Sequence, residues 1–134
     1  MAAVIPNEGK LQFLKQGLGA APIETLILKL FCNNYTPVAG STAAAFTEAS
    51  GAGYASKSLT AANWTYAGTT TQTASYPVQT WTFTGALTTN STIYGYYVVG
   101  ATSGKVYFAE LLAAPFTPAN NGDNLSVTPN YSQA

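Results

Sequence analysis

The sequence contains no histidine and no arginine, and only five lysines and five acidic residues are spread over its 134 positions. Charged residues make up 7% of the chain, against about 25% in an average soluble domain. Without histidine, the chain lacks the usual general base and the commonest nitrogen ligand of zinc. The lysines are scattered singly and the net charge is zero, so no cationic cluster is available for a phosphate backbone. We therefore expect no enzymatic activity and no nucleic-acid partner.

Cysteine is nearly absent as well, because Cys32 is the only one. A single cysteine excludes an intrachain disulfide, and its position after an apolar run predicts a buried structural thiol. That apolar run, residues 26–32, is interrupted by Lys29 and is far shorter than the ~20 residues that span a membrane. The N-terminus lacks the basic start and long apolar core of a signal peptide. We therefore expect no membrane partner.

The few acidic residues show no pairing that would suggest a catalytic or metal site. Glu110 lies in an apolar segment and is expected to point outward or to pair with Lys57 or Lys105. Asp123 lies in the asparagine-rich segment 120–124, where one carboxylate is too few for a typical calcium site. Such a segment more often forms a turn. We expect no cofactor and no metal.

What the sequence does contain is apolar and neutral polar residues in regular patterns. One short helix is predicted over residues 7–18, with Asn7 as its N-cap and Gly19 as its left-handed stop. The apolar positions of this helix repeat at i, i+3 and i+7: Leu11, Leu14 and Leu18. A helix this short needs a sheet or a neighbouring subunit to lie against.

From residue 24 onward the pattern predicts short strands separated by turns. The predicted strands are 24–32, 54–60, 63–67, 77–84, 93–99, 105–112 and 125–128. Residues 39–53 are expected to form a long loop with room for one helical turn, and residues 69–74 a loop or an edge. The prolines at 115 and 118 are expected to end the strand before them.

This arrangement predicts a mainly β protein with one short N-terminal helix. Strands at regular spacing without intervening helices are typical of an antiparallel β-sandwich or a flattened barrel. We expect a single β domain over residues 21–134 and an N-terminal arm over residues 1–20 that carries the helix.

Tyrosines gather in the predicted hairpin of strands 93–99 and 105–112. Tyrosine favours protein interfaces and sugar-stacking sites because it joins a large apolar ring to a polar tip. Simple cross-strand packing is the alternative, and the sequence does not separate core from interface tyrosines. The candidate interface residues are Leu11, Phe13, Leu14, Leu18, Tyr94, Tyr96, Tyr97 and Tyr107.

The order of several short segments resembles a group of small structural proteins of tailed bacteriophages. The segments are LILKLFCNNYTP (26–37), FTEA (46–49), GYA (53–55), LTAANW (59–64), WTF (81–83), IYGYYVV (93–99) and GDNL (122–125). Together they cover nearly the whole chain. The resemblance implies a virion component with no catalytic residues.

Among such proteins we favour a capsid decoration (cement) protein, a group that resembles this chain in being small, mostly β and often trimeric. The resemblance then implies a homo-oligomer, with a trimer favoured, that is made in the host cytoplasm and binds the major capsid protein on the capsid surface. A tail or baseplate component that binds tail proteins is the alternative within this class. From the residues alone, a carbohydrate-binding module that uses Trp64, Tyr66 or Tyr96 is a third hypothesis.

Overall fold

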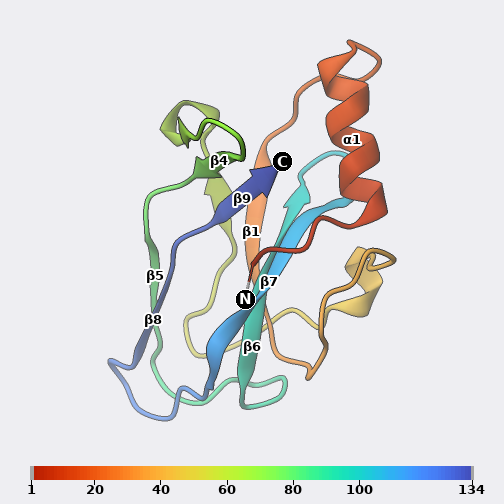
Figure 1. Ribbon diagram of the computed structural model, residues 1–134. Helices are drawn as coiled ribbons and strands as arrows, with labels where there is room; N and C mark the ends of the chain where they lie inside the picture. The colour runs from red at the N-terminus through yellow and green to blue at the C-terminus, as the bar shows by residue number, and fades with distance from the viewer. Residues whose placement is uncertain (1, 134) are drawn as a thin grey trace.

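The computed structural model describes residues 2–133, which form one α-helix, α1 (Asn7–Gly17), and nine strands (Figure 1). The strands are β1 (Leu26–Phe31), β2 (Lys57–Leu59), β3 (Thr65–Ala67), β4 (Gln72–Ser75), β5 (Gln79–Thr82), β6 (Ile93–Gly100), β7 (Val106–Phe116), β8 (Asn124–Val127) and β9 (Asn130–Gln133). They form three antiparallel sheets in the orders β2-β1-β6-β7, β3-β4-β9 and β5-β8. The predicted mainly β, sandwich-like single domain with one short helix is confirmed.

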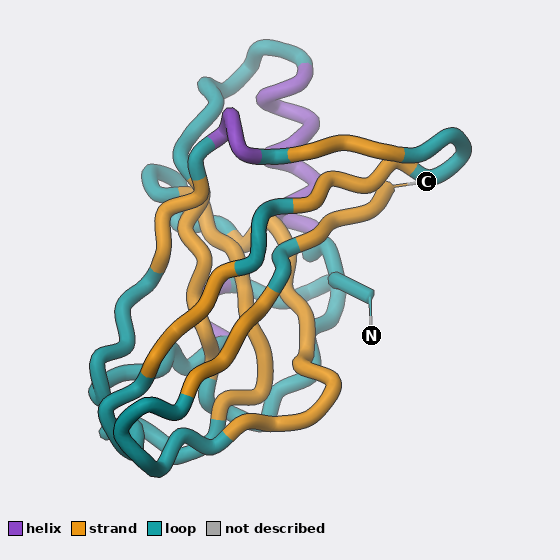
Figure 2. The backbone as a smooth tube through the Cα atoms, turned by 90° about the vertical axis from the view of Figure 1, so that its left-hand side faces the viewer, coloured by secondary structure: helices purple, strands orange, loops and turns teal. Residues whose placement is uncertain are grey.

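The four-stranded sheet is covered on both faces. Leu28 and Leu30 of β1 point into one core cluster, and Phe31 points into the other, because successive side chains of a strand alternate. The pair β5–β8 covers the first face with Trp81 and other apolar side chains, and Figures 1 and 2 show this pair as a separate layer. Phe46, which follows the 3-10 turn Ala43–Ala45, covers the second face. Strand β6 is an inner strand of this sheet, paired with β1 on one side and β7 on the other.

Several predicted boundaries differ from the structure. Asn7 does not cap α1: the N-cap is Pro6, and the Asn7 N–H donates to the carbonyl of Ala39 instead. Pro115 does not end its strand, because β7 continues to Phe116 as an edge strand of the sheet, where a missing N–H costs no ladder hydrogen bond. Gly19 has the predicted left-handed conformation, with φ of 75°.

The three-stranded sheet was the least predictable part of the fold. Strand β9 was not predicted, and β4, expected to be a loop or an edge, lies at the centre of this sheet. Both strands are short and mostly polar, and they are held by backbone pairing and by contacts such as the Thr73–Ser132 hydroxyl hydrogen bond of 2.9 Å.

Within residues 2–133, no helix has the length and apolar character needed to span a membrane.

Candidate functional site

The N-terminal segment lies tightly on the edge strand β7. The backbone of Val4 donates to and accepts from Ala109, at 2.8 and 2.9 Å. A Glu8 carboxylate oxygen accepts the N–H of Val106 at 2.7 Å. At Gly9 the helix approaches so closely that a Cβ would lie 2.5 Å from the carbonyl oxygen of Tyr107. The beginning of α1 is therefore part of the folded domain. That residues 1–20 act as an attachment arm stays a prediction.

Docking through Gly9 determines which side of α1 faces the sheet. Phe13 lies one turn after Gly9 and packs edge-on against Tyr107, with ring centroids 5.0 Å apart. The apolar positions on the opposite side of the helix face outward and are 49%, 61% and 83% exposed: Leu11, Leu14 and Leu18. We refer to these three residues as the leucine stripe. Helical periodicity correctly placed them on one face, and the structure turns that face away from the chain's own core.

An apolar groove of about 750 Å³ runs between α1 and the three-stranded sheet. Phe13 lines it from the helix and Tyr131 lines it from β9. Tyr66 of β3 and Trp64, which directly precedes that strand, line it from the three-stranded sheet. The Phe13 and Tyr131 rings lie 4.9 Å apart, whereas Tyr66 is 76% exposed. We call this the aromatic groove. Its volume is in the range of about 300–1,000 Å³ that is typical of ligand sites.

Polar groups at the floor of the groove are paired with one another. The Tyr107 hydroxyl donates to Glu24 at 2.7 Å and accepts from the Gln16 amide at 2.7 Å. Glu24 also accepts the N–H groups of Thr102 and Ser103, each at 2.8 Å. Burial raises the pKa of Glu24, but hydrogen bonds from Ser103, Tyr107 and Thr102 outweigh it and leave that pKa below its ordinary value. The pKa of the Tyr107 hydroxyl is raised, first by burial and then by Glu24.

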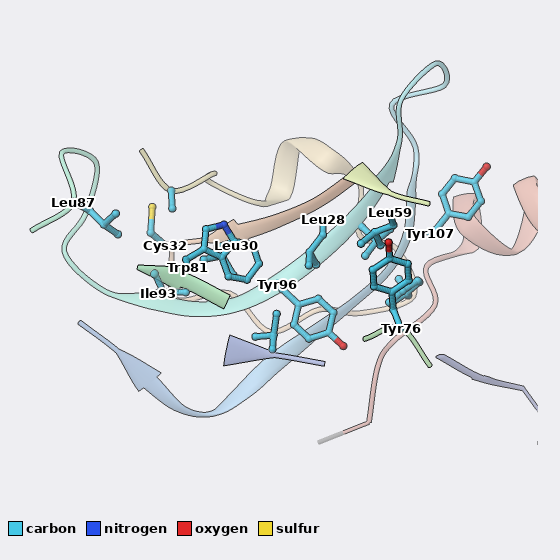
Figure 3. Close-up of a cluster of buried hydrophobic side chains, with 14 of the residues drawn as sticks. Leu28, Leu30, Cys32, Leu59, Tyr76, Trp81, Leu87, Ile93, Tyr96 and Tyr107 are labelled. Carbon is cyan, nitrogen blue, oxygen red and sulfur yellow. The ribbon is translucent and has the colours of Figure 1, made fainter. Parts of the chain in front are cut away.

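Most of the candidate interface tyrosines belong to the core. Tyr96, Tyr97 and Tyr107 are at most 4% exposed, and Figure 3 shows Tyr96 and Tyr107 within one buried cluster. The reason is that both faces of β6 and β7 are covered, so either face of the hairpin buries its tyrosines. Tyr94 is half-buried and lines a separate polar pocket of about 500 Å³ beside Asn33, Asn34 and Asn90. Of the candidate residues, the three leucines present the open apolar surface.

Glu110 was expected to point outward or to pair with a lysine. It is half-buried and accepts the hydroxyl hydrogen of Tyr96 at 2.6 Å, which corrects the predicted pairing with Lys57 or Lys105. Its partner lies directly opposite it in the β6–β7 register. Burial, followed by Glu110, raises the pKa of the Tyr96 hydroxyl.

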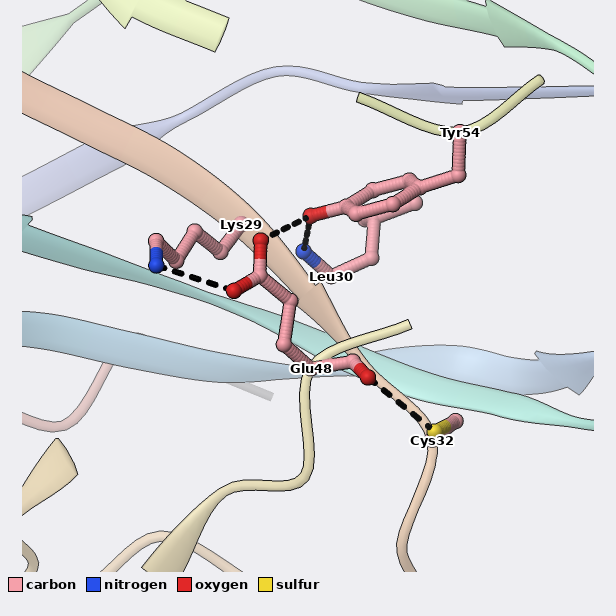
Figure 4. Close-up of polar contacts among 5 residues, drawn as sticks. All are labelled: Lys29, Leu30, Cys32, Glu48 and Tyr54. Carbon is pink, nitrogen blue, oxygen red and sulfur yellow. Dashed lines mark hydrogen bonds and ion pairs between the residues drawn. The ribbon is translucent and has the colours of Figure 1, made fainter. Parts of the chain in front are cut away.

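Cys32 and Lys29 lie at a second polar cluster, where a loop is fastened to β1 (Figure 4). Lys29 pairs with Glu48 at 2.9 Å, and the Tyr54 hydroxyl donates to the same carboxylate at 3.1 Å. Tyr54 also accepts the N–H of Leu30 at 3.1 Å. Cys32 is 1% exposed, and its thiol donates to backbone carbonyls of this loop, so the predicted buried structural thiol is confirmed. Every polar group here has a structural partner.

The remaining predicted candidate, Asp123, closes a turn. Its carboxylate accepts the N–H groups of Ala119 and Asn120, both at 2.9 Å, and these hydrogen bonds lower its pKa. Within residues 2–133, no group of three or more His, Cys, Asp or Glu side chains is placed to hold a metal ion. The turn predicted for this segment is confirmed.

Comparisons of the chain with protein-family models, with curated proteins and with solved structures gave no significant match. The function must therefore be argued from the leucine stripe and the aromatic groove. Both are apolar surfaces on α1, one on its outward side and one on its inner flank. Such surfaces bind other molecules by excluding water, without any reacting group.

Proposed function

We propose that this chain is a non-enzymatic structural protein of a bacteriophage virion, of the capsid decoration (cement) type. In this role it binds neighbouring subunits of the major capsid protein and holds them together. The observation that carries the proposal is the leucine stripe, an apolar helix face that its own fold leaves uncovered. The sequence resemblance to phage structural proteins supports the choice of the virion.

Attachment by a small apolar surface suits a protein that is present in many copies. Burial of apolar surface contributes about 25 cal/mol per Å², so three leucines supply only weak binding at a single contact. A symmetric oligomer, with a trimer favoured, would present several stripes at once to a repeating lattice of subunits. The second contact is then intramolecular, and the overall affinity exceeds that of one site by a factor of about 10²–10⁴.

The composition supports the same role. With 7% charged residues, neighbouring copies repel one another little. Apolar contacts are also insensitive to screening, so attachment to the particle should survive ~1 M NaCl, where the Debye length falls to about 3 Å. A tail or baseplate component is the alternative within the same class.

Copy number separates these two locations. Quantitative mass spectrometry of purified virions should find on the order of hundreds of copies if the protein decorates a symmetric shell. A few to a few dozen copies, on the order of one or several rings of subunits, would instead place it in the tail. Its absence from the particle would refute the proposal.

Substitution is a sharper test of the surface than deletion, because the chain before Phe13 is part of the fold. We expect the triple variant Leu11→Gln, Leu14→Gln, Leu18→Gln to lose attachment to the particle while its melting temperature stays close to that of the wild type. The matched control is Val38→Gln with Val78→Gln, which changes apolar residues of similar exposure, 52% and 59%, outside α1. Retained attachment of the triple variant would show that the stripe is not the binding surface.

Carbohydrate binding is a second candidate, and the aromatic groove favours it. Tyr66 is exposed at the rim of the groove, where its ring could stack on a sugar. Trp64 is half-covered by Tyr76, and Tyr96 is buried, which leaves Tyr66 as the most accessible of the three proposed rings. A glycan array should then give binding that Tyr66→Ala removes, whereas Tyr94→Ala, on another surface, leaves it intact.

A further inference from the structure

The distribution of charge around the leucine stripe indicates what kind of surface it fits. Lys10 lies one turn before Leu14, and Lys15 one turn after Leu11, so the two lysines border the stripe on opposite sides. Both lysines are exposed. The outward face of α1 is therefore an apolar strip between two positive charges.

These lysines differ from the other three. Lys29 pairs with Glu48 at 2.9 Å, Lys105 lies 3.7 Å from Glu8, and Lys57 lies over the ring of Trp81. Within residues 2–133, neither Lys10 nor Lys15 takes part in an ion pair. Within the described residues, the two lysines that form neither an ion pair nor a cation–π contact thus stand beside the uncovered apolar surface.

Among residues 2–133, every acidic side chain is already engaged within the fold and none is left to match these lysines. Each of the five acids already accepts hydrogen bonds or forms an ion pair within its own fold: Glu8, Glu24, Glu48, Glu110 and Asp123. A second copy that docked its own stripe here would bring further lysines toward Lys10 and Lys15. Like charges at such a contact oppose association. Three leucines also cover only part of the about 800 Å² that each partner buries in a standard interface.

We propose that the outward face of α1 binds a segment of another protein that is apolar along its centre and acidic at its edges. The inference rests on the proposed function for the existence of that partner, and it adds the partner's chemistry. On a capsid, the bound element would be an exposed acidic, leucine- or valine-bearing segment of the major capsid protein. Contacts between copies of this chain would then use other surfaces.

The apolar strip and the lysines have separate roles in this contact. Burial of the leucines provides most of the affinity and does not depend on salt. The lysines select the partner, since complementary charge contributes to specificity and to the association rate more than to affinity. Because exposed ion pairs are individually weak, two of them together favour an acidic over a basic partner by roughly tenfold.

A charge-swap experiment with the full chain tests this. The probes are two fluorescent helical peptides with leucines at i, i+3 and i+7, one flanked by glutamates and the other by lysines. Fluorescence anisotropy should show the acidic peptide binding about tenfold more tightly, and Lys10→Glu with Lys15→Glu should reverse that preference. The preference should shrink at ~1 M NaCl. Lys57→Glu is the control for a change of charge elsewhere and should leave the preference unchanged.

Three outcomes would overturn the inference. The first is equal affinity for the two peptides, or no binding of either at low salt. The second is binding that persists when Leu14→Gln and Leu18→Gln are introduced. The third is occupancy of the face by something else: a leucine-dependent dimer in analytical ultracentrifugation, or binding to phosphatidylglycerol vesicles with no binding of the acidic peptide.

The peptide experiment and the virion experiment test separate claims, so one claim can be refuted while the other is kept. A protein that is absent from virions but prefers the acidic peptide keeps the partner chemistry and loses the proposed function. A protein that is present in hundreds of copies but does not distinguish the peptides keeps the function and loses the charge selectivity.

Discussion

The strand β1 and the helix α1 each carry a regular row of leucines, and the fold treats the two rows in opposite ways. Leu28 and Leu30 of β1 are 0% exposed, whereas Leu14 of α1 and Leu18 at its C-cap are 61% and 83% exposed. Strand β1 is paired on both sides, by β2 and β6, and both of its faces are covered. Helix α1 rests on the sheet by one side only.

The difference shows that a period of apolar residues defines a shared face but not the direction of that face. Which side of α1 faces the sheet is determined by residues that a hydrophobic pattern does not reveal. Gly9 permits contact with the backbone of β7, and Glu8 accepts the N–H of Val106. Gly9 lies on the opposite side of the helix from the leucines, so the contact that it permits turns them outward.

The largest expected effect is a loss of stability when a buried leucine of β1 is shortened. Leu30→Ala removes a fully buried side chain and should lower the free energy of unfolding by about 2–5 kcal/mol. Leu18→Ala makes the same chemical change at an exposed site and should alter it by no more than about 0.5 kcal/mol. Urea denaturation followed by circular dichroism would measure both. Similar losses for the two variants would mean that Leu18 is covered in solution.

The next effect concerns the contact that orients α1. Gly9→Ala places a Cβ against the Tyr107 and Val106 carbonyl oxygens and should cost about 1–3 kcal/mol of stability. Gly17→Ala is the matched control, because nothing lies within 4 Å of the added Cβ. It should raise stability by about 0.5–1 kcal/mol through better helix propensity. If both variants are stabilised, the close approach at Gly9 is not present in solution.

The smallest effect is an expected pH dependence on the α1 side. The folded-state pKa of Glu24 lies below its ordinary value of 4.5. The stability that the ionised Glu24 carboxylate adds to the fold is therefore complete above pH 4.5 and is lost as the pH falls through the lowered pKa. Because Glu24 holds Tyr107, which contacts Phe13 and Gln16, acid should weaken the support under α1.

Thermal unfolding from pH 7 to pH 3 would test this dependence. The melting temperature of the wild type should fall more steeply below pH 4.5 than that of Glu24→Gln, which lacks the titrating group. Parallel curves for the two proteins would contradict the assignment of acid sensitivity to Glu24.

Alternation and turn residues were sufficient to predict much of the β fold. The β6–β7 hairpin and the burial of Cys32 followed from local pattern. Strand β9 did not, because its residues are mostly polar and it forms through pairing with β4, a distant segment. Local sequence carries little information about such a strand.

The candidate site was only half predictable for a related reason. Periodicity identified the leucine stripe, but its outward direction depends on β7, about a hundred residues further along the chain. Tyr96, Tyr97 and Tyr107 lie in the core, and alternation alone does not reveal this because both faces of their sheet are covered. Trp64 and Tyr66 were recognised singly, but their convergence with Phe13 and Tyr131 into a groove is tertiary.

The pairing of Val4 with Ala109 also bears on how the chain folds. The two residues are about a hundred positions apart, and contacts so distant in sequence form slowly. Until this contact forms, α1 has no β7 to lie on, and Phe13, which packs on Tyr107 in the folded protein, is exposed together with the leucines of the unpaired β1. We therefore expect refolding from denaturant to yield less native protein as the protein concentration rises.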